Sequence, residues 1–154
     1  ETQFVELEDG SILMNARGGG RVTARSKDGG QTWSTMRLDP SLTGPECAAG
    51  LLRYSFRSEP GQKSRILFSL PGAIKGRKHG TIWLSYDDGA TWPVRRKLQA
   101  GFFAYSCLTR LGDGDIGCVY GSRGKRRAAD EVGPQNVMFA SFSLDWLTDG
   151  RDSD

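Results

Sequence analysis

Histidine is almost missing from this sequence, cysteine is sparse, and long apolar runs do not occur. The 154 residues include one histidine, His79, and no C-x-x-C pair, so the usual ligands of a zinc site are missing and we predict no metal and no cofactor. The three cysteines leave at least one thiol unpaired, and we expect buried free thiols at Cys47, Cys107 and Cys118. No stretch approaches the roughly 20 apolar residues of a transmembrane helix, so we expect no membrane segment.

Neither sign of charge dominates the chain. Lysine and arginine number 21 against 18 aspartates and glutamates, and the net charge of +3 is too small to indicate nucleic-acid binding. Charged residues make up 25% and hydrophobic residues 37%, which is typical of one globular domain and excludes a disordered chain. The one basic cluster holds no aromatic residue that could stack on bases, so we interpret it as a solvated loop and expect no nucleic-acid partner. Its members are Arg123, Lys125, Arg126 and Arg127.

Glycine, by contrast, is abundant at 21 residues, and it recurs within a repeated motif. Residues 26–33 read SKDGGQTW and residues 85–92 read SYDDGATW, so both match S-x-D-x-G-x-T-W at positions that differ by 59 residues. The aspartate and serine of such a motif can bond nearby backbone N–H groups and hold a tight turn, and its glycine permits a positive φ. We expect Trp33 to return an apolar ring to the core, and we interpret the motif as structural.

Short β-rich runs separated by turn residues predict an all-β fold. The runs form two units of four strands and a third, incomplete unit; we expect strands at 3–7, 11–17, 21–25 and 35–38, then at 50–56, 65–70, 81–85 and 93–98, and finally at 102–109, 115–120 and 136–142. Repeated four-stranded antiparallel units are typical of the blades of a β-propeller.

The length of the repeat also predicts how much of a propeller is present. At 59 residues a unit, the chain holds about two and a half blades, whereas propellers close with roughly four to eight. We therefore predict a partial propeller over residues 1–147, followed by a polar, frayed tail at 148–154. A start at Glu1 rather than Met suggests a fragment or a processed product, whose partner would be the remaining N-terminal half of the propeller.

Three segments carry a resemblance to the exo-α-sialidase (neuraminidase) family, whose six-bladed propeller contains such turns, known as Asp boxes. Residues 1–17 (ETQFVELEDGSILMNAR) resemble the part that holds the family's catalytic glutamate and the second arginine of its triad, 16 residues apart. Residues 75–81 (KGRKHGT) resemble the region of the third arginine, and residues 105–109 (YSCLT), followed by GDGDIG, are similar to the segment with the nucleophilic tyrosine. The resemblance runs from residue 1 to about residue 146 and implies the C-terminal portion of the catalytic domain.

This resemblance implies an activity and a set of roles. The family hydrolyses terminal sialic acids from glycoconjugates with retention through a tyrosyl intermediate, outside the usual two-carboxylate scheme of glycosidases. By resemblance, Tyr105 is the nucleophile and Glu1 its base, while Arg17 and Arg77 bind the carboxylate of the sialylated glycan with charge-assisted bonds. The implied compartment of the parent protein is secreted, periplasmic or lysosomal.

A non-catalytic Asp-box module that binds glycans or a protein partner is the alternative. The family's first triad arginine and its aspartate acid/base would lie upstream of Glu1, and Gly121 stands after Tyr120 where the family commonly has glutamate. On residue type alone, an arginine can cap a strand and a tyrosine can pack within one. We predict that Glu1, Arg17, Arg77 and Tyr105 converge on one side of the propeller axis, and that this chain alone is inactive.

Overall fold

The computed structural model describes residues 1–123 and 136–152, and within them it contains eleven strands and one short helix. The first sheet consists of β1 (Thr2–Glu6), β2 (Ile12–Arg17), β3 (Arg21–Ser26) and β4 (Arg37–Leu38). The second consists of β5 (Gly50–Ser55), β6 (Arg65–Pro71), β7 (Lys78–Ser85) and β8 (Val94–Phe102). The third consists of β9 (Ala104–Arg110), β10 (Ile116–Ser122) and β11 (Asn136–Phe142), and α1 (Leu144–Thr148) follows it. Within these ranges no helix is long and apolar enough to cross a membrane.

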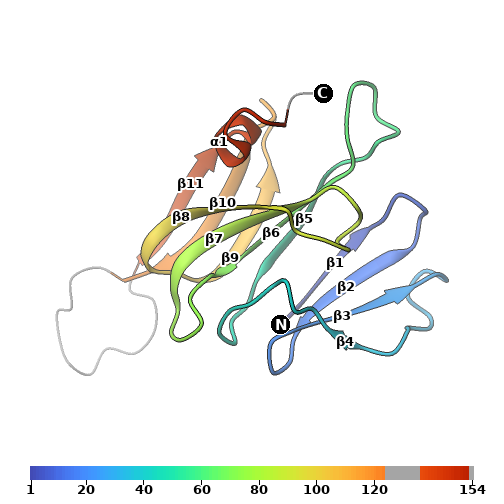
Figure 1. The fold of residues 1–154 in the computed structure, drawn as a ribbon, viewed down its shortest axis with the longest axis horizontal. Coiled ribbons are helices and arrows are strands. Elements are labelled where there is room, and N and C mark those ends of the chain that lie inside the picture. Colours follow the sequence, from blue (N-terminus) through green and yellow to red (C-terminus); the bar gives the residue numbers. More distant parts are fainter. Residues whose placement is uncertain (124–135, 153–154) are drawn as a thin grey trace.

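The sheets have the topology predicted for propeller blades. Every pairing is antiparallel, and in each sheet the strands lie in sequence order. Figure 1 shows the sheets side by side, and the first strand of the second sheet, β5, contacts both β1 and β9, the first strands of the other two. The all-β prediction and the prediction of four-stranded antiparallel blades are therefore confirmed.

The core consists of two apolar layers, one on each face of the second sheet. Alternate residues of β6 point to opposite faces, so Phe68 packs in one layer and Leu67 in the other. In the same way, β7 gives Trp83 to the first layer and its neighbour Ile82 to the second. All seven residues of β6 are buried, and this central sheet fixes the spacing of the two outer sheets.

Both copies of the repeated motif fold into the same hydrogen-bonded turn. In the first, Asp28 accepts the Thr32 N–H at 2.8 Å and the Thr32 hydroxyl at 2.5 Å, while the Ser26 hydroxyl oxygen accepts the Gly30 N–H at 2.8 Å. Asp87 makes the equivalent contacts in the second copy at 2.8 and 2.6 Å. These bonds hold the pKa of the Asp28 carboxyl down to about 2, chiefly through the Thr32 hydroxyl. The motif is a turn closed by its own side chains.

The two tryptophans of the motif have different environments. Trp92 is buried and packs on Phe68 with ring centroids 5.8 Å apart. Trp33 remains 37% exposed and packs on Phe4, itself 54% exposed, with centroids 5.7 Å apart. The prediction that Trp33 enters the core is wrong, because no second sheet covers this face within the described residues.

One further prediction is corrected. Cys47 and Cys118 are buried free thiols, but Cys107 is exposed because its side chain points to the solvent face of β9. In the third unit a helix follows β11 directly: the Ser143 hydroxyl caps α1 by accepting the Trp146 N–H at 3.1 Å. Of the predicted basic cluster, only Arg123 falls within the described residues, and its guanidinium lies over the Phe102 ring at 4.4 Å.

The polar tail is docked, not frayed, up to residue 152. Asp152 is 7% exposed and forms a buried ion pair with Arg65, with Nη2 to Oδ2 at 2.8 Å and Nε to Oδ2 at 2.9 Å. Tyr86 donates its hydroxyl to Asp152 at 2.7 Å. The prediction failed because polar composition alone does not reveal that Asp152 has a buried arginine and a tyrosine as partners.

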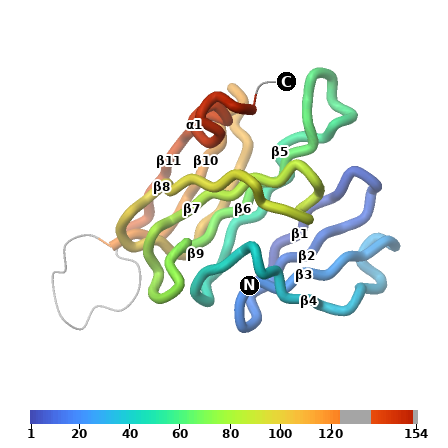
Figure 2. Tube along the Cα trace, viewed as in Figure 1, coloured from blue at the N-terminus to red at the C-terminus, as the bar shows by residue number. Residues whose placement is uncertain are grey.

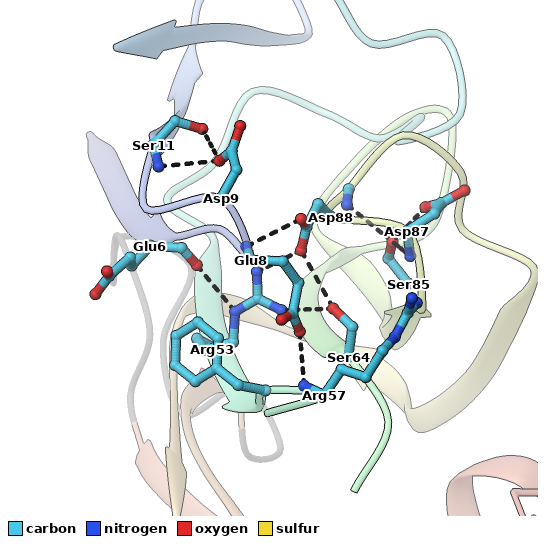
Figure 3. Close-up of polar contacts among 12 residues, drawn as sticks. Glu6, Glu8, Asp9, Ser11, Arg53, Arg57, Ser64, Ser85, Asp87 and Asp88 are labelled. Atoms are coloured by element: carbon cyan, nitrogen blue, oxygen red, sulfur yellow. Dashed lines mark hydrogen bonds and ion pairs between the residues drawn. The ribbon is translucent and has the colours of Figure 1, made fainter. Parts of the chain in front are cut away.

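A second polar network joins the first two sheets at the Asp-box ends of their strands (Figure 3). Its centre is Asp88, which follows Asp87, the motif aspartate of the second copy, and has a φ of 58°. Asp88 accepts the Glu8 N–H at 3.1 Å, the Arg53 guanidinium at 2.6 Å and the Ser64 hydroxyl at 3.2 Å. Arg53 also donates to the Glu6 carbonyl at 2.9 Å, so this arginine and aspartate tie the β1–β2 turn to the second sheet.

Candidate functional site

The four predicted site residues lie at the strand ends opposite the Asp boxes. Each Asp box joins the third strand of a sheet to the fourth. Arg17 instead ends β2 at its turn to β3, and Arg77 lies in the connection from β6 to β7, so both are at connections between second and third strands. In an antiparallel sheet these two kinds of connection lie at opposite ends. Figure 2 shows the N-terminus, the β2–β3 turn, the loop before β5 and the β6–β7 hairpin along one side of the molecule. The topology therefore gathers this set of loops on one rim.

The first half of the site is a cluster of charges around Arg17. Its Nη1 lies 2.7 Å from Glu1 Oε2, and its Nη2 lies 3.3 Å from Glu46 Oε2. The backbone supports the same arrangement, because the Arg17 N–H donates to the Glu1 carbonyl at 3.1 Å. The Arg17 hydrogen bond lowers the pKa of the Glu1 carboxyl, and the positive charge of Arg77 lowers it further. Glu1 is thus held as a carboxylate.

The second half of the site is the pair formed by Arg77 and Tyr105. Arg77 Nη1 donates to the Tyr105 hydroxyl oxygen at 2.8 Å, and the guanidinium carbon lies 4.7 Å from the centre of the Tyr105 ring. A guanidinium has donors only, so the phenol oxygen accepts here and its own proton remains available to a base. The Tyr105 side chain is 45% exposed, which leaves it open to a ligand.

A β-bulge directs Tyr105 out of its sheet. Cys107 pairs with Val119 and Ala104 pairs with Gly121, so two residues of β9, Tyr105 and Ser106, stand opposite one residue of β10. Tyr105 has a φ of 53°, a left-handed conformation that non-glycine residues seldom adopt. Bulges and strained residues of this kind are often found at functional sites. Ser106 anchors the bulge from below through a 2.8 Å hydrogen bond between its hydroxyl and that of Ser69.

The β6–β7 hairpin fixes Arg77 against the strand that carries Tyr105. The Phe103 N–H donates to the Arg77 carbonyl at 3.0 Å, and the Gly72 N–H closes the hairpin by donating to the His79 carbonyl at 2.7 Å. Gly80 packs directly on the fully buried Phe103 ring, where an added Cβ would approach a ring carbon to 2.1 Å. Any larger residue at position 80 would force either the Phe103 ring or the hairpin to move.

Glu46 connects the two halves, and sequence reasoning missed it. Its carboxylate accepts from Arg17, and its backbone carbonyl accepts from Arg77 Nη2 at 3.4 Å. The contacts therefore run from Glu1 through Arg17, Glu46 and Arg77 to Tyr105, with Glu1 and Tyr105 at opposite ends. The sequence could have suggested Glu46 only through its position in the loop between β4 and β5, because this loop brings the chain back to the rim that carries Arg17.

The arrangement presents two guanidinium groups next to an exposed phenol and two carboxylates. Arginine pairs of this kind bind carboxylates with charge-assisted hydrogen bonds. Among the described side chains of this cluster the phenol is the neutral one, and Glu1 is a candidate base. Within residues 1–123 and 136–152, no group of three or more histidine, cysteine, aspartate or glutamate side chains could hold a metal ion.

Comparison with known proteins shows similarity to sialidases over most of the chain. The chain is 38% identical to a sialidase of Micromonospora viridifaciens over 154 aligned residues, 96% of this chain and 22% of the relative. It is 33% identical to a sialidase of Bacteroides fragilis, with 79% of this chain and 24% of that protein aligned. It is also 31% identical to an anhydrosialidase of Macrobdella decora, over 96% of this chain and 21% of the relative. The chain thus spans between a fifth and a quarter of the length of these relatives, and no family model matches it.

Solved structures agree with the sequence relatives. The intramolecular trans-sialidase of Ruminococcus gnavus, in complex with oseltamivir carboxylate, superposes with a TM-score of 0.79 at 29% identity, over 96% of this chain and 33% of that one. The leech intramolecular trans-sialidase, complexed with 2,7-anhydro-Neu5Ac, gives a TM-score of 0.79 at 28% identity, over 97% and 24% of the two chains. The sheets described above therefore correspond to blades of sialidase β-propellers.

Proposed function

We propose that this chain, a homologue of sialidases with sialidase-like propeller blades, carries part of the catalytic site of an exo-α-sialidase. The reaction is the hydrolysis of a terminal sialic acid from a glycoconjugate, with retention of configuration. The observation that carries the proposal is the contact of Arg77 with the Tyr105 hydroxyl, because it combines a nucleophile with a cation at the rim where Glu1 and Arg17 also lie.

The chemistry assigned to Tyr105 is nucleophilic. Its oxygen attacks the anomeric carbon and forms a sialyl-tyrosine as the glycosidic bond breaks. The phenol proton passes to the Glu1 carboxylate, and the leaving oxygen takes a proton from the family's acid/base aspartate, which we expect on another blade. Arg77 stabilises the negative charge that develops on the phenol oxygen during this transfer. In the second step water attacks the same carbon and gives a proton to that aspartate, while the bond to Tyr105 breaks and Glu1 returns its proton to the phenol oxygen. A phenol suits this substrate, because a carboxylate nucleophile would repel the carboxylate of sialic acid.

The role assigned to Arg17 and Arg77 is to bind that substrate carboxylate. Both guanidinium groups contact Glu46 in the free protein. Arg17 contacts the Glu46 carboxylate at 3.3 Å, and Arg77 contacts the Glu46 backbone carbonyl at 3.4 Å. A bound carboxylate would take the place of the Glu46 side chain on Arg17. The exchange is feasible because the Glu46 side chain is 55% exposed and free to turn into solvent.

Further blades of the complete protein would close the propeller and supply the remaining groups of the site. Four large apolar side chains of the first blade are exposed, which is unusual unless another element covers them. They are Phe4, Trp33, Met36 and Leu38, with exposures of 54%, 37%, 62% and 63%. We expect the family's first arginine and its acid/base aspartate on those blades, and we therefore expect this chain to be inactive by itself.

The test is the hydrolysis of a fluorogenic sialoside by the full-length protein. Wild type should release the fluorophore, and Tyr105→Phe, which deletes only the hydroxyl, should abolish turnover without a change in circular dichroism. Tyr120→Phe is the matched control: Tyr120 is 7% exposed and stacks on Phe103 at 4.6 Å, so this variant should remain active. A wild-type protein that binds sialoglycans but does not cleave them would contradict the proposal and support a binding module.

A further inference from the structure

A buried arginine lies behind the charged rim. Arg21, the first residue of β3, is 2% exposed, and its guanidinium carbon lies 5.5 Å from the centre of the Phe68 ring. Its Nε donates to Asn15 Oδ1 at 2.7 Å and its Nη1 donates to the Cys47 carbonyl at 3.1 Å. Burial lowers the pKa of Arg21 to about 10, so the side chain remains charged at neutral pH.

This arrangement is not one that core stability alone would favour. No carboxylate within the described residues forms an ion pair with Arg21, and its Nη2 and Asn15 Nδ2 have no hydrogen-bond partner there. Buried charges without an ionic partner are costly, and apolar residues of similar volume commonly stabilise a fold as well or better. The contact of Arg21 with the Cys47 carbonyl instead connects it to the loop that carries Glu46.

Cys47 links Arg21 to both halves of the site. Its carbonyl is held by Arg21, and it directly follows Glu46, the residue between Arg17 and Arg77. Its thiol accepts the backbone N–H of Tyr105 at 3.5 Å, at the strained position in the bulge. Cys47 is 0% exposed, so these contacts are shielded from water.

We propose that Arg21 is a positioning residue that holds the Cys47 peptide and, through it, fixes Glu46 between the two arginines and Tyr105 in its bulge. Arg21 touches no substrate and acts only through Cys47. A guanidinium suits this position because its rigid fork binds Asn15 and the Cys47 carbonyl at once, which a lysine cannot do. The kinetic consequences rest on the proposed sialidase function, whereas the structural consequence does not.

The test compares Arg21→Met and Arg21→Lys with wild type in the full-length protein, using two independent readouts. The first is alkylation of the folded protein by iodoacetamide, followed by peptide mass spectrometry. Exposed Cys107 gives the rate of a free thiol, and buried Cys118 reports on the integrity of the fold. In both variants we expect Cys47 to become reactive at least tenfold faster than in wild type, while Cys118 stays protected. The second readout is turnover of the fluorogenic sialoside, where kcat should fall about 10- to 100-fold from misplacement of the nucleophile.

The outcomes separate this proposal from the proposed function. Cys47 that stays as protected as in wild type, or unchanged kcat in an active enzyme, would overturn the role of Arg21. Cys118 that becomes reactive in both variants would also overturn it, since Arg21 would then support the whole fold. If the wild-type protein does not cleave sialosides, the sialidase proposal fails, and the alkylation of Cys47 still decides whether Arg21 holds this loop.

Discussion

Arg77 holds the Tyr105 hydroxyl at 2.8 Å from its Nη1, and its guanidinium carbon lies over the same ring, 4.7 Å from the centroid. The β6–β7 hairpin and a bulge in β9 bring these two residues together from different strands. A tyrosine so placed is exposed, conformationally strained and in contact with a cation. Packing alone requires none of these properties, whereas the proposed nucleophile needs the exposure and the cation, and strained residues are often found at functional sites.

Substitution of Arg77 should separate charge from geometry. Arg77→Met removes the donor to the phenol oxygen, and we expect kcat for a fluorogenic sialoside to fall by about 10²- to 10³-fold, the usual cost of one donor to a developing charge. Arg77→Lys keeps the positive charge without the forked guanidinium, and its kcat should fall less. Arg95, exposed on β8, provides the control, because Arg95→Met should leave kcat unchanged. Equal activities of all three variants would exclude a role of Arg77 in the chemical step.

The hydrogen bond between Arg17 and Glu1 predicts a pH dependence. Because this bond lowers the pKa of the folded Glu1 below its ordinary value of 4.5, its stabilisation is present above that value and is lost as the pH falls through the lower, folded pKa. Both side chains are about one-third exposed, so the effect on folding stability is small. The effect on a catalytic base is larger: the acid limb of kcat/KM should lie below pH 4.5 in wild type and move to higher pH in Arg17→Met.

Arg17→Lys is the control for this pH profile, because a lysine retains the positive charge beside Glu1 and should keep the limb low. The magnitude of kcat/KM will fall in both variants if Arg17 binds the substrate, and so the position of the limb is the quantity to compare. A limb that stays in place in Arg17→Met would show that Glu1 is not the titrating base.

Glu46 should compete with the substrate for Arg17. Glu46→Gln keeps the size of the side chain and its backbone carbonyl, but it weakens the contact to the guanidinium at 3.3 Å. A loss of about 1 kcal/mol of competing interaction corresponds to a roughly fivefold lower KM, with kcat little changed. Titration with free sialic acid should show the same gain in affinity. A raised KM would mean instead that Glu46 contacts the substrate directly.

The blades could be predicted from the sequence because their signals are local. Alternating apolar residues and two copies of one turn motif are sufficient for the strand order, and the observed strands lie within a few residues of the predicted ranges. The environment of a motif residue is not local. Trp33 and Trp92 occupy the same position of the same motif, yet only Trp92 is covered, because only it faces a second sheet.

The residues of the site likewise divide into those that the sequence could suggest and those that depend on the fold. Glu1, Arg17, Arg77 and Tyr105 were suggested by resemblance to sialidases, which supplies spacing and residue type. Glu46 has neither signal, because its role depends on where an irregular loop returns to the rim. The bulge that exposes Tyr105 was equally hidden, since its sequence, AYSCLTR, reads as an ordinary strand.

The ion pair between Arg65 and Asp152 should contribute strongly to folding. Both residues are at least 93% buried, and the carboxylate also accepts from Tyr86. Asp152→Ala leaves a buried guanidinium uncompensated, so we expect the free energy of unfolding to fall by about 3–5 kcal/mol in urea denaturation. Replacing both partners, with Arg65→Met and Asp152→Leu, should restore most of this loss, because the cost arises from the unpaired charge. Asp149→Asn serves as the surface control: it keeps a residue type that tolerates the φ of 56° at this position, its side chain is 61% exposed, and it should change the free energy by about 1 kcal/mol or less. If the double variant is as unstable as Asp152→Ala, the tail contributes through packing and the ion pair is not its anchor.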